Sequence, residues 1–221
     1  MDHWRYYLHG RLLELFGLKP QAIAAECERR CWHLVETIED AGYSARDLRR
    51  PGIQEALRAL PAFPRASNRA AFVLAALERF EEAEALFRRT LALEPNNAVA
   101  HFNLGYTHDK RGQYHKAIEE FRAATRLNPK IDRAWYGLGL AHAQLGQHRE
   151  AAEALEQAAT LQPMNHHAWY QLGMALHLTG NAERFMQVVM HLLRFDPKMT
   201  RRLILDSGRS DLAHLVQHLV V

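Results

Sequence analysis

The feature that most constrains the fold is a short segment that returns every 34 residues along the chain. "AHFNLG" at 100–105 is followed by "AWYGLG" at 134–139 and "AWYQLG" at 168–173. Four prolines keep the same phase, and they are Pro95, Pro129, Pro163 and Pro197. A fixed period of this length predicts an array of small structural units, each stacked on its neighbours, rather than one globular core.

Each unit has the pattern of two helices joined by a short turn. Within 132–165, Trp135 and Leu138 are spaced as on one helical face, and Gly146 suits the end of that first helix. Pro163 follows a second apolar-periodic segment, where a helix should end. The chain is therefore expected to be all-α, with helical hairpins as its repeating element.

This pattern resembles the tetratricopeptide repeat (TPR), which has Trp, Leu, Gly and Tyr in its first helix, Ala and Phe in its second, and then Pro. The residues that match in phase are Leu104, Gly105, Ala117, Phe121, Ala124, Trp135, Leu138, Gly139, Ala151, Ala158, Trp169, Leu172 and Gly173. The resemblance implies a right-handed α-solenoid of helix-turn-helix repeats. It also implies that glycine and alanine let the two helices of a repeat approach closely.

The repeat phase divides the chain into three parts. Four TPR-like repeats are expected at 64–97, 98–131, 132–165 and 166–199. Residues 1–63 are interpreted as a degenerate N-terminal repeat followed by an out-of-phase helical segment. Residues 200–221 are interpreted as C-terminal capping helices, since the last repeat of an array leaves an apolar face to cover. Either the N-terminal helix or the C-terminal cap could instead form a homodimer.

Several positions depart from the family pattern. Phe185 stands where Ala is expected, and it should push the helices of the fourth repeat apart or shift their register. His101 replaces the Trp, and His108 and His142 replace the Tyr. We interpret these histidines as half-buried packing residues, with a response to pH near 6 as the alternative.

No pattern in the chain indicates chemistry, so no catalytic residue and no cofactor is predicted, and the protein is not expected to be an enzyme. Cys27, Cys31 and His33 supply too few ligands for a zinc site, and they read as part of an apolar helical stripe. The net charge is +3, with both signs interspersed, which does not favour nucleic acid. No apolar run is long enough for a membrane span, and the first residues lack a secretory signal, so a cytoplasmic location is expected.

In TPR proteins the first helices line a concave groove that binds extended peptides or partner helices. The resemblance carries this role to the residues one, five and eight places after the Trp position, which include one aromatic residue per repeat. The predicted groove residues are Phe72, Phe102, Asn103, Tyr106, Arg133, Tyr136, Leu140, Tyr170, Met174 and His177. Phe102, Tyr136 and Tyr170 form an aromatic ladder, and because Trp, Leu and Gly already fill the packing positions, we expect these three side chains to be exposed in the groove.

One TPR subfamily clamps an acidic C-terminal carboxylate, and Asn103 and Arg133 lie near two of its positions. The clamp also needs cationic and polar residues where this chain has Phe72 and Gly137. Recognition of a C-terminal carboxylate is therefore not expected.

The predicted function is a non-catalytic protein–protein interaction scaffold or adaptor that binds a peptide or a partner helix in its groove. Three alternatives stay open at this point. The chain could be a dedicated chaperone or assembly factor of a bacterial secretion or pilus system, a regulatory subunit of an enzyme complex, or a self-assembling structural protein.

Overall fold

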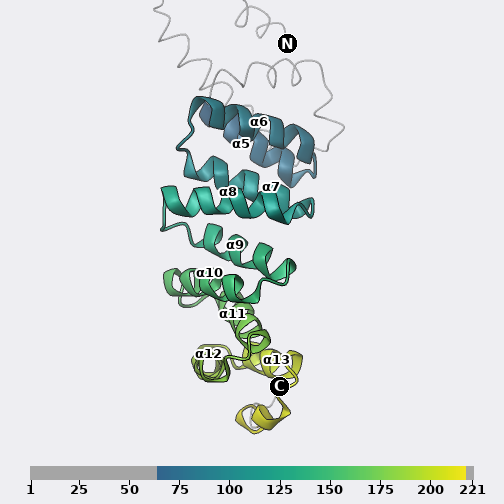
Figure 1. Ribbon diagram of the computed structural model, residues 1–221, viewed down its shortest axis with the longest axis vertical. Helices are drawn as coiled ribbons and strands as arrows, with labels where there is room; N and C mark the ends of the chain where they lie inside the picture. Colours follow the sequence, from purple (N-terminus) through teal and green to yellow (C-terminus); the bar gives the residue numbers. More distant parts are fainter. Residues whose placement is uncertain (1–63, 218–221) are drawn as a thin grey trace, which may run out of the picture. The chain divides into compact units, whose positions relative to one another are not determined.

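A computed structural model describes residues 64–217 of the chain, and every secondary-structure element among these residues is a helix (Figure 1). The helices are α5 (Pro64–Ala76), α6 (Phe80–Leu93), α7 (Ala98–Lys110), α8 (Tyr114–Leu127), α9 (Asp132–Gln144), α10 (His148–Leu161), α11 (His166–Leu178), α12 (Ala182–Phe195), α13 (Pro197–Asp206) and the 3₁₀ helix η3 (Ser210–Leu215). First helices begin at 64, 98, 132 and 166, and second helices at 80, 114, 148 and 182. The expected all-α class built from repeated helix pairs is confirmed.

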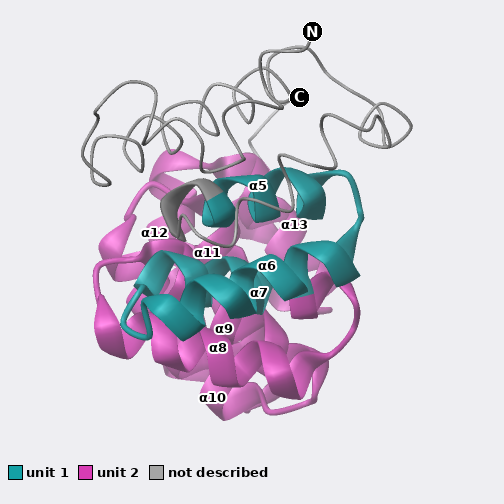
Figure 2. Cartoon of the chain, turned by 90° about the horizontal axis from the view of Figure 1, so that it is seen from above, with its two compact units in different colours: residues 1–107 teal, residues 108–221 magenta. Residues whose placement is uncertain are grey.

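The chain divides into two compact units, residues 1–107 and residues 108–221 (Figure 2). The described part of the first unit holds α5, α6 and most of α7, and the second unit holds the end of α7 and all later helices. The proposed N-terminal repeat, the dimerisation helix within it, Cys27 and Cys31 lie outside the described residues. None of the helices between residues 64 and 217 is both long and apolar enough to cross a bilayer.

The turn between the two helices of a pair has a left-handed residue at one fixed position. Gly112, Gly146 and Gly180 have φ values of 69°, 71° and 73° there. Glu78 occupies the same place in the first pair, with φ of 59°. A side chain in this conformation brings Cβ close to the next carbonyl oxygen, at a cost of about 1–2 kcal/mol. The first turn is therefore strained where the later turns are not.

In α7, α9 and α11, an aromatic side chain ties the start of the helix to the loop before it. The indole Nε1 of Trp135 donates to the carbonyl oxygen of Pro129 at 2.9 Å, and that of Trp169 to Pro163 at 2.8 Å. In α7 the imidazole Nε2 of His101 lies 3.0 Å from the carbonyl oxygen of Pro95. His101 thus keeps the polar contact of the tryptophan that it replaces.

Asn and Asp side chains cap several helices that follow these loops. The Oδ1 atoms of Asn97, Asn165, Asn181 and Asp196 each accept a hydrogen bond from a backbone N–H three residues on. Such caps satisfy donors that have no partner within the helix, and each contributes about 1 kcal/mol. The caps fix the starts of α7, α11, α12 and α13.

Close approach of the helices in the third pair depends on Gly139. A Cβ at this position would lie 2.5 Å from Cγ of Leu155 and 3.2 Å from the carbonyl oxygen of Ala151. These distances are below van der Waals contact, so α9 and α10 could not keep their spacing with a larger residue. The close approach that the Gly and Ala pattern implies is present here.

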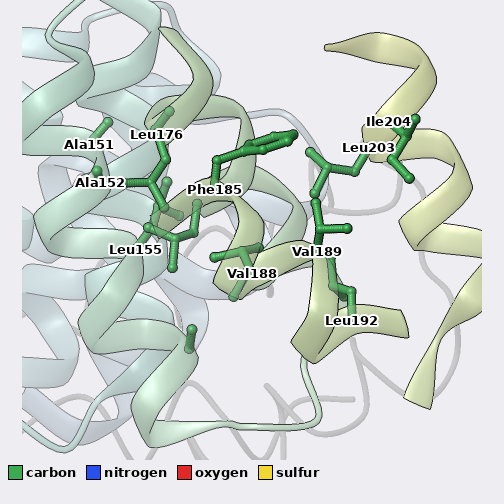
Figure 3. Packing of buried hydrophobic residues seen from close by; sticks show 14 of the residues in the cluster. Ala151, Ala152, Leu155, Leu176, Phe185, Val188, Val189, Leu192, Leu203 and Ile204 are labelled. Carbon is green, nitrogen blue, oxygen red and sulfur yellow. The ribbon is translucent and has the colours of Figure 1, made fainter. Parts of the chain in front are cut away.

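The fourth pair packs differently around Phe185, which is fully buried. A Cβ at Gly173 would meet side-chain atoms of Leu203, at 2.7 Å, and Val188, at 3.3 Å, and not the backbone of α12. In Figure 3, Phe185 and Val188 lie between Leu155 and Leu176 on one side and Leu203 on the other. The phenyl ring fills the space that an alanine would leave between α11 and α12, as the departure from the repeat pattern suggested.

After α12, the chain continues as α13, a Ser-Gly turn and η3. Leu203, Ile204, Leu212 and Val216 from this segment join the core cluster of the last two repeats. Pro197 stands in the first turn of α13 and Asp196 caps it, an arrangement that favours a helix start. The segment covers apolar surface that α11 and α12 would otherwise expose.

The left-handed turn position gives a paired stability prediction. Glu78→Gly should raise the free energy of unfolding by about 1 kcal/mol, because it removes the Cβ from a left-handed residue. Gly146→Glu, at the equivalent turn, should lower it by a similar amount. Urea unfolding followed by circular dichroism measures both. Equal effects of the same sign would contradict the strain argument.

The glycine contact predicts non-additive energetics. Gly139→Ala should lower the free energy of unfolding by about 1–3 kcal/mol through overpacking, and Leu155→Ala by about 2–5 kcal/mol through a cavity. In the double variant the new methyl group should occupy part of that cavity, so the loss should be smaller than the sum. A double-mutant cycle by urea unfolding tests this, and strict additivity would show that the two side chains do not compete for space.

Candidate partner-binding surface

The predicted groove residues of the first unit have unequal exposure. Phe72 on α5 and Tyr106 on α7 are exposed, at 46% and 39%. Phe102 is partly buried. Asn103 is buried, with 8% exposure, so it presents little surface to a partner. Phe72, Phe102 and Tyr106 are therefore the residues of this unit that offer apolar surface.

In the second unit the predicted residues lie on α9 and α11. Tyr136, Tyr170 and Met174 are partly buried and pack against the core cluster with one side. Leu140 is also partly buried, and Arg133 is exposed. The tyrosines contact the core more than a freely exposed aromatic ladder would. Each nevertheless keeps part of its surface accessible to solvent.

Burial also changes the ionisation of these two phenols. Desolvation by burial raises the pKa of Tyr136. The pKa of Tyr170 is raised first by burial and then by the hydrogen bond and charge of Asp206. Both side chains are therefore neutral hydroxyls at physiological pH, able to donate a hydrogen bond.

Tyr170 is part of a small polar network with α13. Its hydroxyl donates to Oδ2 of Asp206 at 2.6 Å, and Nε of Arg202 lies 3.4 Å from the same oxygen. The guanidinium carbon of Arg202 is 5.3 Å from the centre of the Tyr170 ring, within the range of a cation–π contact. A phenol and a guanidinium thus converge on one carboxylate.

The sequence did not point to Arg202 and Asp206, because α13 lies beyond the last full repeat and the family pattern assigns no role there. Their spacing of four along a helix was the available signal. Leu205, beside them, is 66% exposed, and Leu178 at the end of α11 is 55% exposed. These two leucines add apolar surface that sequence reasoning also missed.

His177, the remaining predicted residue, is partly buried, and its ring centre lies 5.7 Å from that of Phe185. It contacts the buried phenyl group of the fourth repeat on one side. Its contribution to a binding surface is therefore smaller than that of Tyr170 or Met174.

Gly137, where the carboxylate-clamp subfamily has an arginine, has a packing role. A Cβ at Gly137 would lie 2.6 Å from Cζ of Phe121, whose side chain is fully buried. No side chain fits at residue 137 unless this ring moves. The absence of the clamp arginine therefore has a steric reason in this chain.

His108 and His142 are more deeply buried than the half-buried positions expected from sequence, with exposures of 1% and 4%. Nδ1 of His108 lies 3.0 Å from Oε1 of Gln113, and Nδ1 of His142 lies 2.6 Å from Oε1 of Gln147. An amide oxygen only accepts, so Nδ1 carries the proton in each ring. These contacts give both histidines a structural role within the hairpin turn.

A second group of histidines lies near the start of α11. Nδ1 of His166 is 3.2 Å from Oδ2 of Asp196, and the ring of His191 packs on Trp169 with centres 4.1 Å apart. Between residues 64 and 217, no three His, Cys, Asp or Glu side chains come together in a way that could hold a metal ion. These contacts link α11 to the end of α12.

Comparison with protein families gives two matches. Residues 76–158 match the family described as anaphase-promoting complex, cyclosome, subunit 3, and residues 142–199 match a tetratricopeptide repeat family. Together the two matches run through α6 to α12. Comparison with curated protein sequences finds no match.

Among solved structures, a crystal structure of MamA protein has a TM-score of 0.65 and 19% identity, covering 85% of this chain and 97% of that one. YrrB, described as a TPR protein with an unusual peptide-binding site, has a TM-score of 0.60 and 19% identity, covering 75% and 96%. The first TPR of Spaghetti (RPAP3), bound to an HSP90 peptide, has a TM-score of 0.52 and 19% identity, covering 53% and 93%.

These structural likenesses are at low identity and establish the fold. The repeat families, the 34-residue spacing of the helix starts and the shared glycine turns agree with one another. The chain belongs to the tetratricopeptide repeat proteins.

Proposed function

We propose that this protein is a non-catalytic scaffold that binds a peptide or a helix of another protein through the surface of its first helices. In the second unit that surface comprises Tyr136, Leu140, Tyr170 and Met174. In the first unit it comprises Phe72, Phe102 and Tyr106. We refer to these two sets as the second-unit and first-unit binding surfaces.

The observation that carries this proposal is the repetition of partly exposed aromatic and apolar side chains at one position of successive first helices. Core packing alone would leave polar residues there, as it does on much of α10, where Glu153, Gln157 and Thr160 are exposed. Aromatic side chains that are held rigidly and are partly accessible are common hot spots of protein interfaces. Two of the structurally similar TPR proteins are described as binding peptides, which supports the same role for this chain.

The packing of Tyr136 and Tyr170 affects how the proposal must be tested. Both tyrosines contact the core cluster, so replacing them with alanine should also lower stability. Leu140 and Met174 are partly buried on the same helices, and Met174 also contacts the cluster. Glutamine is close in size to both side chains, so it leaves a smaller cavity than a change from tyrosine to alanine. They are the better positions for separating binding from folding.

The double variant Leu140→Gln/Met174→Gln should lose binding with little change in melting temperature. Peptides selected by phage display on the wild-type protein would be synthesised, and their affinities measured by fluorescence anisotropy. An apolar hot spot is worth about 2 kcal/mol, so the affinity should fall about 30-fold.

A control carries two substitutions on a second helix, Glu153→Gln and Gln157→Ala on the exposed side of α10. This control should bind as the wild type does. If the control loses binding and the Leu140/Met174 variant does not, the partner lies on the second helices, and the proposed surface is wrong.

A further inference from the structure

The network of Tyr170, Arg202 and Asp206 is an arrangement that binds a carboxylate, and the carboxylate now in it belongs to the protein itself. The Tyr170 hydroxyl lies 2.6 Å and the Arg202 Nε 3.4 Å from Oδ2 of Asp206. We propose that, when a peptide binds the second-unit surface, an Asp or Glu side chain of that peptide takes the place of Asp206. This inference rests on the proposed function and names the chemistry of the partner.

Asp206 is a weakly held occupant. It is the last residue of α13, where the helix dipole disfavours a negative charge. Arg202 precedes it by four residues, which is the less favourable order for an ion pair along a helix. The two side chains are 65% and 43% exposed, so solvent screens their attraction. An external carboxylate therefore displaces a weak Arg202–Asp206 pair, and the Tyr170 hydroxyl, which now donates to Asp206, can donate to the incoming group instead.

The site can bind an incoming carboxylate more strongly than it binds Asp206. Arg202 reaches Asp206 through Nε at the long distance of 3.4 Å. Its terminal nitrogens, with Nε, form the planar fork that binds a carboxylate with two parallel hydrogen bonds. The guanidinium stays near the Tyr170 ring, and this contact limits its motion before the ligand arrives. A free peptide carboxylate can adopt a bidentate geometry, whereas Asp206 meets Arg202 through Nε at 3.4 Å.

The charges around the site favour an acidic partner. Helix α11 contains no Asp, Glu, Lys or Arg. On the neighbouring first helix α9 and on α13 the cationic residues are Arg133, Lys198, Arg201 and Arg202, against Asp132 and Asp206. Helix α10, a second helix, instead carries Glu150, Glu153 and Glu156 with Arg149. Helices α9 and α13 together thus carry an excess of positive charge, whereas α10 carries an excess of negative charge.

Apolar side chains next to the site define the rest of the ligand. Leu205, beside Asp206, is 66% exposed, and Met174 lies one helical turn beyond Tyr170 on the same helix. A peptide that places an acidic side chain between apolar ones would contact Arg202, Leu205 and Met174 together. The partner we propose is therefore a linear peptide with an internal Asp or Glu flanked by apolar residues, and not a free C-terminus.

The test uses a random peptide library whose members have acetylated N-termini and amidated C-termini, so that side chains are the only carboxylates. The full-length protein is compared with Arg202→Gln, Asp206→Ala and, as the matched control, Arg201→Gln. Arg201 is the adjacent exposed cation on the same helix. A selected acidic peptide and its Glu→Gln or Asp→Asn twin are then measured by fluorescence anisotropy.

The wild type should select acidic residues next to apolar ones. Arg202→Gln should lower the affinity for the acidic peptide about tenfold and leave the affinity for its amide twin unchanged, as expected for one charge-assisted contact. Asp206→Ala should raise the affinity for the acidic peptide about two- to fivefold. Arg201→Gln should change the affinity for neither the acidic peptide nor its amide twin by a comparable factor.

The results that would overturn the inference differ from those that would overturn the proposed function. Selection of apolar peptides with no acidic preference, or equal effects of Arg201→Gln and Arg202→Gln, would remove the carboxylate site and leave the scaffold role intact. Selection that requires an uncapped C-terminus would also remove it. Self-association that depends on Arg202 would show that a second copy of the protein, and not a peptide, binds this site. Selection of no peptide by any variant would overturn both proposals.

Discussion

The structure depends first on how closely the two helices of a repeat can approach. Gly139 has no side chain at the point where α9 meets Leu155 and the backbone of Ala151. Because backbone and side-chain volume set that contact, it determines how closely α9 and α10 can lie. The remaining residues of the first helix can then present one side to the core and the other to solvent. The binding surface is a consequence of this packing rather than an addition to it.

Much of the fold was predictable from the sequence because the small residues of the repeat indicate where two helices pack closely and where the backbone adopts a left-handed conformation. The 34-residue phase predicted the starts of the helix pairs, and Gly112, Gly146 and Gly180 adopt the left-handed conformation that a glycine allows. The phase could not show that Glu78 adopts this conformation too. It does so because the neighbouring helices impose the turn on whichever residue stands there, and a modest local strain is outweighed by their packing.

The substitutions at family positions were harder to interpret from sequence. His101 retains the contact of a tryptophan with a proline carbonyl, which depends on where the ring nitrogen lies and not on hydrophobicity. His108 and His142 are buried because Gln113 and Gln147 satisfy Nδ1, and a pattern of single residues does not reveal a partner five positions away. For the candidate surface, the positions on first helices could be named, but their degree of burial could not, because it depends on the size of the side chains beneath them.

At the C-terminal end of the array, the family pattern predicts little about the structure. Helix α13 begins at Pro197, three residues earlier than a further repeat would, so its side chains fall outside the repeat register. This shift places Arg202 and Asp206 against Tyr170 on α11. The cap that covers the apolar core therefore also brings charge to the edge of the binding surface. An internal repeat contributes aromatic and apolar contacts, which give affinity but little discrimination, whereas a charged contact at one end can set the direction in which a peptide binds. In the binding mode that we propose, the same short helix closes the core and orients the ligand.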